Sequence, residues 1–259
     1  MTANELYEYL KNKAANVREQ TCDGVIVGDP DTRVTRVMTC FKLTSALVGQ
    51  ARERNIPVII CHEPIFSDGE DPAAVTGYDI RKRDLILNAG IAVIRFHDHA
   101  HESVPDYIHR GFIERMGLKI EKQFPRESLG VCRYALETPM TAGAVTALTK
   151  EKLGAEFPRL VGDADMPVRV VCLALGSIGL AQIRLLERPD CDMVITGEVG
   201  EVNVCSYVHD INYFGNRKSL LLLGHCTSEY SGMMMLADDL NRWGIPAEYM
   251  HCGEVYRGV

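Results

Sequence analysis

The stretch VTRVMTCFKLTSALVGQARERNIPVIICHEP, residues 34–64, decides the fold class of this chain. It holds two short apolar runs, rich in valine and isoleucine, on either side of a helical stretch. Residues 83–90, RDLILNAG, and 91–99, IAVIRFHDH, continue the alternation. Nearly unbroken apolar strands that alternate with helices are typical of mostly parallel sheets covered on both faces. The sequence therefore predicts an α/β protein.

A second round of the same alternation follows later in the chain. It runs through VRVVCLALGSIG (168–179), CDMVITGEV (191–199) and KSLLLLGHCTSE (218–229). We therefore predict two similar α/β lobes with mostly parallel sheets, over residues 1–125 and 126–259. IPVIICHE and CDMVITGE are similar strand ends, and the strands after them end in FHDHAH and GHCTSE, which suggests an internal duplication.

Composition narrows the range of functions. The formal net charge of −7 across 259 residues offers no basic surface for nucleic acid. The charged N-terminal stretch lacks a signal-peptide core and no run of 18 apolar residues occurs, so we expect a cytoplasmic protein without membrane contact. Nine cysteines without a C-x-x-C pair predict reduced thiols, for the most part buried, rather than a disulfide framework or a thiolate zinc site.

Imidazole and carboxylate side chains follow three of the predicted strands, at the edge where parallel strands expose their carboxyl ends. They are the natural ligands of divalent transition metals, and there are more of them than one tetrahedral ion needs. We therefore expect two ions, bound in the cleft between the lobes. The candidates form three clusters: His62 with Glu63, His97 to His101, and His225 with Glu229.

Each cluster also has a structural alternative. Adjacent side chains on a strand point to opposite faces, so His62 and Glu63 converge only if the chain turns at Pro64. A strand-like continuation would place His97, His99 and His101 on one face, with Asp98 and Glu102 on the other, whereas a solvated loop is the alternative.

The third cluster is predicted at the start of a helix that ends before Gly244. Thr227 or Ser228 could cap this helix, with His225 in the preceding loop and Glu229 in the first turn. The alternative is that Glu229 only interacts with the helix dipole.

The three clusters, in this order, resemble the Nif-three-like dinuclear metal proteins, a family also catalogued as GTP cyclohydrolase I type 2. Segments that carry the resemblance are CDGVIVGDPDTRVTRVMTC (22–40), IICHEPIF (59–66), HDHAH (97–101), LGSIGLAQ (175–182), VITGEV (194–199) and GHCTSE (224–229). The GHCTSE match is the most specific. Glu63 stands where the family has a histidine, and His101 stands where it has an aspartate.

The resemblance implies a metal-ligand set of His62, Glu63, His101, His225 and Glu229. His97 matches a loop histidine of the family and is a further candidate ligand, whereas the role of His99 stays open. The two exchanges keep three imidazoles and two carboxylates, which favours a rearranged site over a lost one. The resemblance also implies a homohexamer and a hydrolase acting on a nucleotide-like or phosphorylated small molecule.

In such an enzyme, two zinc, iron or manganese ions would activate water, and Glu63 or Glu229 would bridge the ions or act as general base. The alternative is a non-enzymatic metal-binding or scaffold assembly, because HEPIF, HDHAH and GHCTSE contain no lysine or arginine.

Other residues are expected to have structural roles. We predict that Cys61 packs in the core, whereas Cys226 stays open as a thiolate donor. GSIG (176–179) is expected to form a tight turn rather than an anion site, and Glu198 and Glu201 to lie in an exposed loop rather than at the site. Three isolated histidines are assigned structural roles: His109, His209 and His251.

Overall fold

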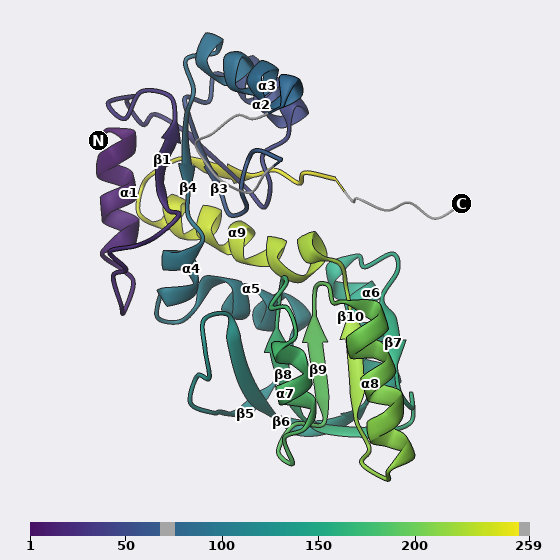
Figure 1. Cartoon of the computed structure of the whole chain (residues 1–259). Coiled ribbons are helices and arrows are strands. Elements are labelled where there is room, and N and C mark those ends of the chain that lie inside the picture. The colour runs from purple at the N-terminus through teal and green to yellow at the C-terminus, as the bar shows by residue number, and fades with distance from the viewer. Residues whose placement is uncertain (68–75, 254–259) are drawn as a thin grey trace. The chain divides into compact units, whose positions relative to one another are not determined.

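The computed structural model describes residues 1–67 and 76–253, which divide into two compact units (Figure 1). Unit 1 contains residues 1–108 and 232–253, and unit 2 contains residues 109–231. This division differs from the predicted boundary between residues 125 and 126. Ala247–Tyr249, the last strand of the described residues, pairs with a strand formed by residues 37–40 and so belongs to unit 1, whereas Ile120–Gln123 pairs with a strand of unit 2.

Unit 1 is built on a five-stranded sheet with the order β1-β4-β3-β2-β11. Four of its strands are parallel, and β1 pairs antiparallel with β4. The strands are β1 (Gly24–Val27), β2 (Val37–Cys40), β3 (Val58–Cys61), β4 (Ala92–Arg95) and β11 (Ala247–Tyr249). The sequence prediction of a mostly parallel sheet is confirmed for this unit.

Helices cover both faces of the sheet in unit 1, which explains its unbroken apolar strands. Val58 and Ile60 belong to a core cluster shared with α1 and α9, whereas Ile59 and Cys61 belong to a second cluster shared with α2 and α3. Figure 1 shows α2 and α3 side by side. The helices are α1 (Ala3–Lys11), α2 (Ser45–Glu53), α3 (Gly77–Asn88), the short α4 (Asp98–Glu102) and the C-terminal part of α9 (His225–Arg242).

Unit 2 is built on a six-stranded mixed sheet with the order β5-β6-β8-β9-β10-β7. Neighbouring strands pair in parallel only between β8 and β9 and between β9 and β10, so the predicted parallel pairing holds for three of these six strands. The strands are β5 (Ile120–Gln123), β6 (Val131–Thr141), β7 (Arg159–Val161), β8 (Pro167–Ala174), β9 (Met193–Thr196) and β10 (Ser219–Leu222). The helices are α5 (Tyr107–Met116), α6 (Ala142–Leu153), α7 (Ala181–Leu186), α8 (Glu201–Tyr213) and the start of α9.

Each of the two sheets contains three neighbouring parallel strands that follow one another along the chain. In unit 1 they are β2-β3-β4, and in unit 2 they are β8-β9-β10. The strand ends that looked alike in the sequence, after residues 61 and 196, follow the middle one of these three strands in each unit. The histidine-containing segments after residues 96 and 224 follow the third one in each unit. The internal similarity therefore extends from sequence to strand order.

The cysteines follow the prediction in all but one pair. Cys172 on β8 and Cys191 form a disulfide in the core of unit 2, although no disulfide was predicted. The remaining seven are free thiols. Cys61 is fully buried and its thiol donates to the carbonyl of Ile94, as expected for a core residue. Among the described residues, no helix is both long and apolar enough to cross a membrane.

Candidate metal centre

Three histidine side chains of unit 1 gather beyond the ends of two neighbouring strands. His62 follows β3, while His97 and His101 follow β4. One ring nitrogen from each lies within 4.8 Å of those of the other two. The ring centroid of His62 is 4.5 Å from that of His97 and 5.2 Å from that of His101, and the last two are 5.2 Å apart. Three imidazoles at this spacing can converge on one ion.

The Nδ1 atom of each ring contacts an oxygen atom. Nδ1 of His62 lies 3.1 Å from the carbonyl oxygen of Phe96, which can only accept a hydrogen bond, so this nitrogen carries the proton. Nδ1 of His101 lies 3.2 Å from Oδ2 of Asp106. A histidine that donates Nδ1–H to such an oxygen presents the lone pair of Nε2, which is the usual arrangement behind a metal-binding imidazole.

Glu63 reaches the same cluster because the chain turns directly after β3. The backbone N–H groups of His62 and Glu63 both donate to the carbonyl of Phe41, at 3.1 and 2.9 Å. Neither residue continues the strand, so their side chains need not point to opposite faces as adjacent side chains of a strand do. Oε1 of Glu63 lies 3.7 Å from Nε2 of His97. The chain thus turns directly after β3 and brings Glu63 close to His97, whereas the role of His62 and Glu63 as metal ligands stays a prediction.

The segment after β4 is a helical turn, so the predicted strand-like continuation is wrong. Residues 98–102 form α4, and His97 and His101 lie four residues apart on one side of it. His99 points elsewhere and is fully buried. Its Nδ1 contacts Asp23 at 2.8 Å, and its Nε2 accepts the backbone N–H of Arg18 at 3.3 Å. With both ring nitrogens engaged, His99 has a structural role.

Asp23 explains why this segment is helical. Its fully buried carboxylate accepts the backbone N–H groups of His97, Asp98 and His99 at 2.7, 3.1 and 2.8 Å. These are N–H groups that a helix start leaves without internal partners. Sequence reasoning did not identify Asp23 as a site residue. Its only signal was the CDGVIVG segment that formed part of the family resemblance.

The charges around His97 favour its protonated form in this structure. Burial alone would lower the pKa of His97, but its hydrogen bonds to Asp98 and Cys22 and the charge of Glu63 outweigh burial and raise the pKa from 6.5 to about 10. The hydrogen bond with His97 is also the main reason that the pKa of Asp98 is held well below its usual range. A cation at this site therefore competes with a proton on His97.

A second cluster, in unit 2, lies at the start of α9. The helix begins at His225, so neither Thr227 nor Ser228 caps it and the predicted loop position of His225 is wrong. The N–H of Ser228 donates to the carbonyl of Gly224, which moves the helix start upstream. His225 and Glu229 thus lie four residues apart, with Nε2 3.2 Å from Oε2. This pair has the same spacing as His97 and His101.

Glu198 belongs to the cluster in unit 2, contrary to the expectation of a loop away from the site. Its side chain is half exposed, yet its Oε1 contacts Nδ1 of His225 at 2.8 Å. The carboxylate thus holds Nδ1 and turns Nε2 toward Glu229, which is only 3% exposed. Glu201 remains exposed, as expected, and pairs with Arg159 at 3.9 Å.

Two glycines leave room for this cluster. A Cβ atom on Gly176 would lie 2.4 Å from Oε1 of Glu229 and 2.9 Å from Nε2 of His225. One on Gly197 would lie 2.8 Å from Oγ of Ser228, which accepts the N–H of Gly176. GSIG is a turn between β8 and α7, as predicted. Its first glycine additionally lets the backbone approach the candidate ligands.

Other candidates lie outside both clusters. His109 is buried and contacts Tyr134 and the carbonyl of Gly130, which confirms its structural role. His209 is exposed on α8, and exposed His251 accepts the N–H of Gly253 through Nδ1.

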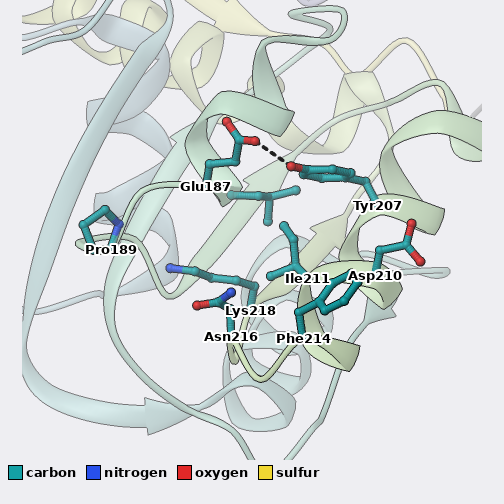
Figure 2. Close-up of a pocket in the computed structure, with 9 residues that line it drawn as sticks. Glu187, Pro189, Tyr207, Asp210, Ile211, Phe214, Asn216 and Lys218 are labelled. Atoms are coloured by element: carbon teal, nitrogen blue, oxygen red, sulfur yellow. Dashed lines mark hydrogen bonds between the residues drawn. The ribbon is translucent and has the colours of Figure 1, made fainter.

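A cavity of about 540 Å³ in unit 2 has none of the candidate ligands in its lining (Figure 2). Tyr207, Phe214 and the stem of Lys218 lie around it, and the hydroxyl of Tyr207 donates to Glu187 at 2.5 Å. The amine of Lys218 donates to the carbonyl of Arg188 at 2.6 Å. His225 and Glu229, the candidate ligands of unit 2, therefore do not line this cavity.

Proteins of known sequence and structure share this architecture. A protein from Pseudomonas aeruginosa named "GTP cyclohydrolase 1 type 2 homolog" is 27% identical over 247 residues, which covers 92% of each chain. A protein of the same name from Clostridium acetobutylicum is 24% identical over 84% of this chain and 80% of its own.

Among solved structures, protein ybgI, described as of unknown function, aligns with a TM-score of 0.81 over 99% of this chain and 100% of its own, at 20% identity. The Staphylococcus aureus protein SA1388 aligns with a TM-score of 0.78 at 19% identity, over 100% of this chain and 99% of its own. These likenesses establish the fold. The family model Duf34/NIF3 (NGG1p interacting factor 3) matches residues 1–251. The chain therefore belongs to the Duf34/NIF3 family.

Proposed function

We propose that this protein binds two divalent metal ions through His62, Glu63, His97, His101, His225 and Glu229. The observation that carries the proposal is the arrangement of the histidines. In both units, a carbonyl or carboxylate oxygen contacts Nδ1 of a candidate ligand, as for His62, His101 and His225. This contact directs Nε2 toward other potential ligands, a pattern that core packing alone does not require.

The donor set fits a borderline divalent ion such as zinc, iron or manganese. Imidazole nitrogens and carboxylate oxygens bind all three, and metal availability then decides which one is held. Of the six proposed ligands, unit 1 supplies four, the number that one four-coordinate ion takes, and unit 2 supplies two. We therefore propose that the two clusters contribute to one dinuclear centre, in the cleft predicted between the lobes.

We further propose that the centre supports hydrolysis of a nucleotide-like or phosphorylated small molecule. Divalent ions supply Lewis acidity, which polarises the bond to be broken and makes water more acidic. Glu63 and Glu229 are the candidates for holding a proton during the reaction, because both carboxylates lie beside a histidine. The name "GTP cyclohydrolase 1 type 2 homolog" of the relatives supports this substrate class.

The alternative is a metal-binding protein without catalysis, such as a storage, delivery or scaffold assembly. It is favoured by the absence of lysine and arginine from the ligand segments HEPIF, HDHAH and GHCTSE, since an anionic substrate is commonly oriented by such groups. The homohexamer and the cytoplasmic location that we predict from the sequence are compatible with both functions. Turnover of phosphorylated substrates by the metal-loaded protein distinguishes them.

The first test is the metal content of the purified protein. We expect at least two ions per chain in the wild type, as the dinuclear model requires. Metal content should fall in His62→Ala, His225→Ala and Glu229→Ala. The matched control is His209→Ala, which removes an exposed histidine of unit 2 from outside the clusters. If the wild type holds no metal after incubation with Zn²⁺, Mn²⁺ or Fe²⁺, the proposal is wrong.

A further inference from the structure

A second group of metal-binding atoms lies next to the three imidazoles of unit 1. The thiol of Cys22, a ring nitrogen of His97 and a carboxylate oxygen of Asp98 all lie within 4.8 Å of one another. Nδ1 of His97 is 2.9 Å from Oδ1 of Asp98. The group therefore lies on the Nδ1 side of the ring, and His97 is common to it and to the three imidazoles.

We propose that Cys22, His97 and Asp98 bind a further thiophilic divalent cation, with Cys22 as a thiolate ligand. This inference rests on the proposed metal centre, because His97 is a proposed ligand of both, and it adds a third ion with a sulfur ligand beside that centre. Cysteine, histidine and aspartate are all established ligands of zinc, with bond lengths of roughly 2.0–2.3 Å. Three protein ligands leave a fourth coordination position to water.

The contacts around Cys22 hold its neighbours in place for such a site. The hydroxyl of Thr21 donates to Oδ2 of Asp98 at 2.9 Å, and the carboxylate of Asp23 binds the N-terminal turn of α4. Three consecutive residues of the chain thus contact the segment that carries His97. His97 and Asp98, two ligands of the proposed site, are therefore oriented before a cation binds, which reduces the entropy lost on binding.

The exposure of Cys22 sets it apart from the core cysteines. Cys40 and Cys61 are fully buried in the apolar core of unit 1, whereas Cys22 is partly exposed. The side chains of His97 and Asp98 are 27% and 14% exposed, so a hydrated cation can reach all three donors. A buried structural thiol would not offer this access.

The charges near the site favour a cation overall. Oε1 of Glu63 lies 3.7 Å from Nε2 of His97, and the thiol of Cys22 donates to the buried carboxylate of Asp23 at 3.6 Å. Arg18 brings the opposing positive charge. The guanidinium of Arg18 pairs with the carboxylate of Glu102 at 3.2 Å, and the negative charge of Glu102 offsets much of the positive charge of Arg18.

Proton balance follows from these contacts. The thiol proton of Cys22 leaves to solvent when the sulfur–metal bond forms. Protonated His97 loses its Nδ1 proton when it binds this cation and its Nε2 proton when it binds an ion of the proposed centre, so with both ions bound the ring is an imidazolate and both protons have left to solvent. Asp98, already ionised, loses only its hydrogen bond to Nδ1. No oxidant or reductant is needed.

Cobalt(II) provides a direct test, because a bound thiolate gives a sulfur-to-cobalt charge-transfer band in the near ultraviolet that imidazole and carboxylate do not give. Titration of the full-length protein with Co²⁺ should produce this band together with visible d–d bands. Cys22→Ser should lose the charge-transfer band and keep the d–d bands of imidazole-bound cobalt. The matched control is Cys205→Ser, a partly exposed cysteine of unit 2, which should keep both.

A second measurement uses the wild type alone, so it does not depend on a variant that folds. Zn²⁺ should protect Cys22, but not Cys205, from alkylation by iodoacetamide, as read by peptide mass spectrometry. Visible d–d bands without a charge-transfer band, together with unprotected Cys22, would overturn this inference and leave the proposed metal centre standing. No cobalt spectrum at all would overturn both. A charge-transfer band that survives in Cys22→Ser would assign the thiolate to another cysteine and also overturn the inference.

Discussion

At the scale of single residues, the candidate centre depends on groups that bind no metal themselves. Asp23 is the main example, because one buried carboxylate holds three backbone N–H groups and the ring of His99. Its charge is balanced by these donors rather than by a cationic partner. The direction of His97 and His101 therefore depends on a residue more than 70 positions earlier in the chain.

Asp23→Asn tests this dependence. The new amide NH₂ would face one of the N–H donors that the carboxylate now accepts, so a buried donor loses its partner. We expect the free energy of unfolding to fall by about 2 kcal/mol, as for loss of a charge-assisted hydrogen bond. Urea denaturation with a chelator present measures this. Asp31→Asn, at an exposed position, is the control, and an equal loss in both variants would contradict the role of Asp23.

The role of Asp23 could not be predicted from the sequence, although most candidate ligands could. The sequence was sufficient to select His62, His97, His101, His225 and Glu229 as candidates, because each residue type and its place after an apolar strand are local features. The helical form of residues 98–102 could not be predicted in this way. Alternating histidines look like a strand, and the acceptor that makes the segment helical is distant in sequence.

At the scale of elements, tight turns after strands bring the backbone close to the candidate ligands. Residues 176–179, between β8 and α7, contain two glycines in the left-handed region, with φ values of +69° and +66°. Gly176 lies against Glu229 and His225, whereas a Cβ atom on Gly179 would have nothing within 4 Å. The turn type was predictable from its glycines, but the neighbour of Gly176 was not.

Gly176→Ala and Gly179→Ala form a matched pair. Both place alanine at a positive φ, at a similar backbone cost of about 1 kcal/mol. Only the first brings a methyl group into contact with Glu229. We therefore expect metal content to fall in Gly176→Ala and to stay near the wild-type value in Gly179→Ala, as measured by elemental analysis. Equal metal content in the two variants would show that this close approach does not matter for binding.

At the scale of the whole molecule, the chain passes from unit 1 to unit 2 and back. Alternating strands and helices were sufficient to predict two α/β units, but not their boundary. β11 is only three residues long and pairs with β2, about 210 positions earlier, through backbone hydrogen bonds that composition does not reveal. The mixed character of the second sheet was missed for the same reason, because β6 and β7 pair antiparallel with strands distant in sequence.

Metal binding should stabilise the folded chain as a whole. A ligand that binds only the folded state, at a free concentration of 100 times its dissociation constant, adds about 2.7 kcal/mol. We therefore expect Zn²⁺ to raise the melting temperature of chelator-treated protein, as followed by circular dichroism. The gain should be smaller in His62→Ala and in Glu229→Ala. Equal gains in the wild type and both variants would place the stabilising ion elsewhere.

The strand order β2-β3-β4 of unit 1 recurs as β8-β9-β10 in unit 2, and this recurrence bears on how the candidate ligands can be exchanged during evolution. In each unit, a glutamate follows the middle parallel strand, and residues four apart follow the third: Glu63 with His97 and His101, and Glu198 with His225 and Glu229. Two strand arrangements of the same order have corresponding positions at the ends of their strands. A mutation that removes an imidazole from one arrangement can be compensated by a mutation that introduces one at another position. Swapping ligand types between such positions is accordingly a practical route for engineers who wish to alter metal preference without redesigning the scaffold.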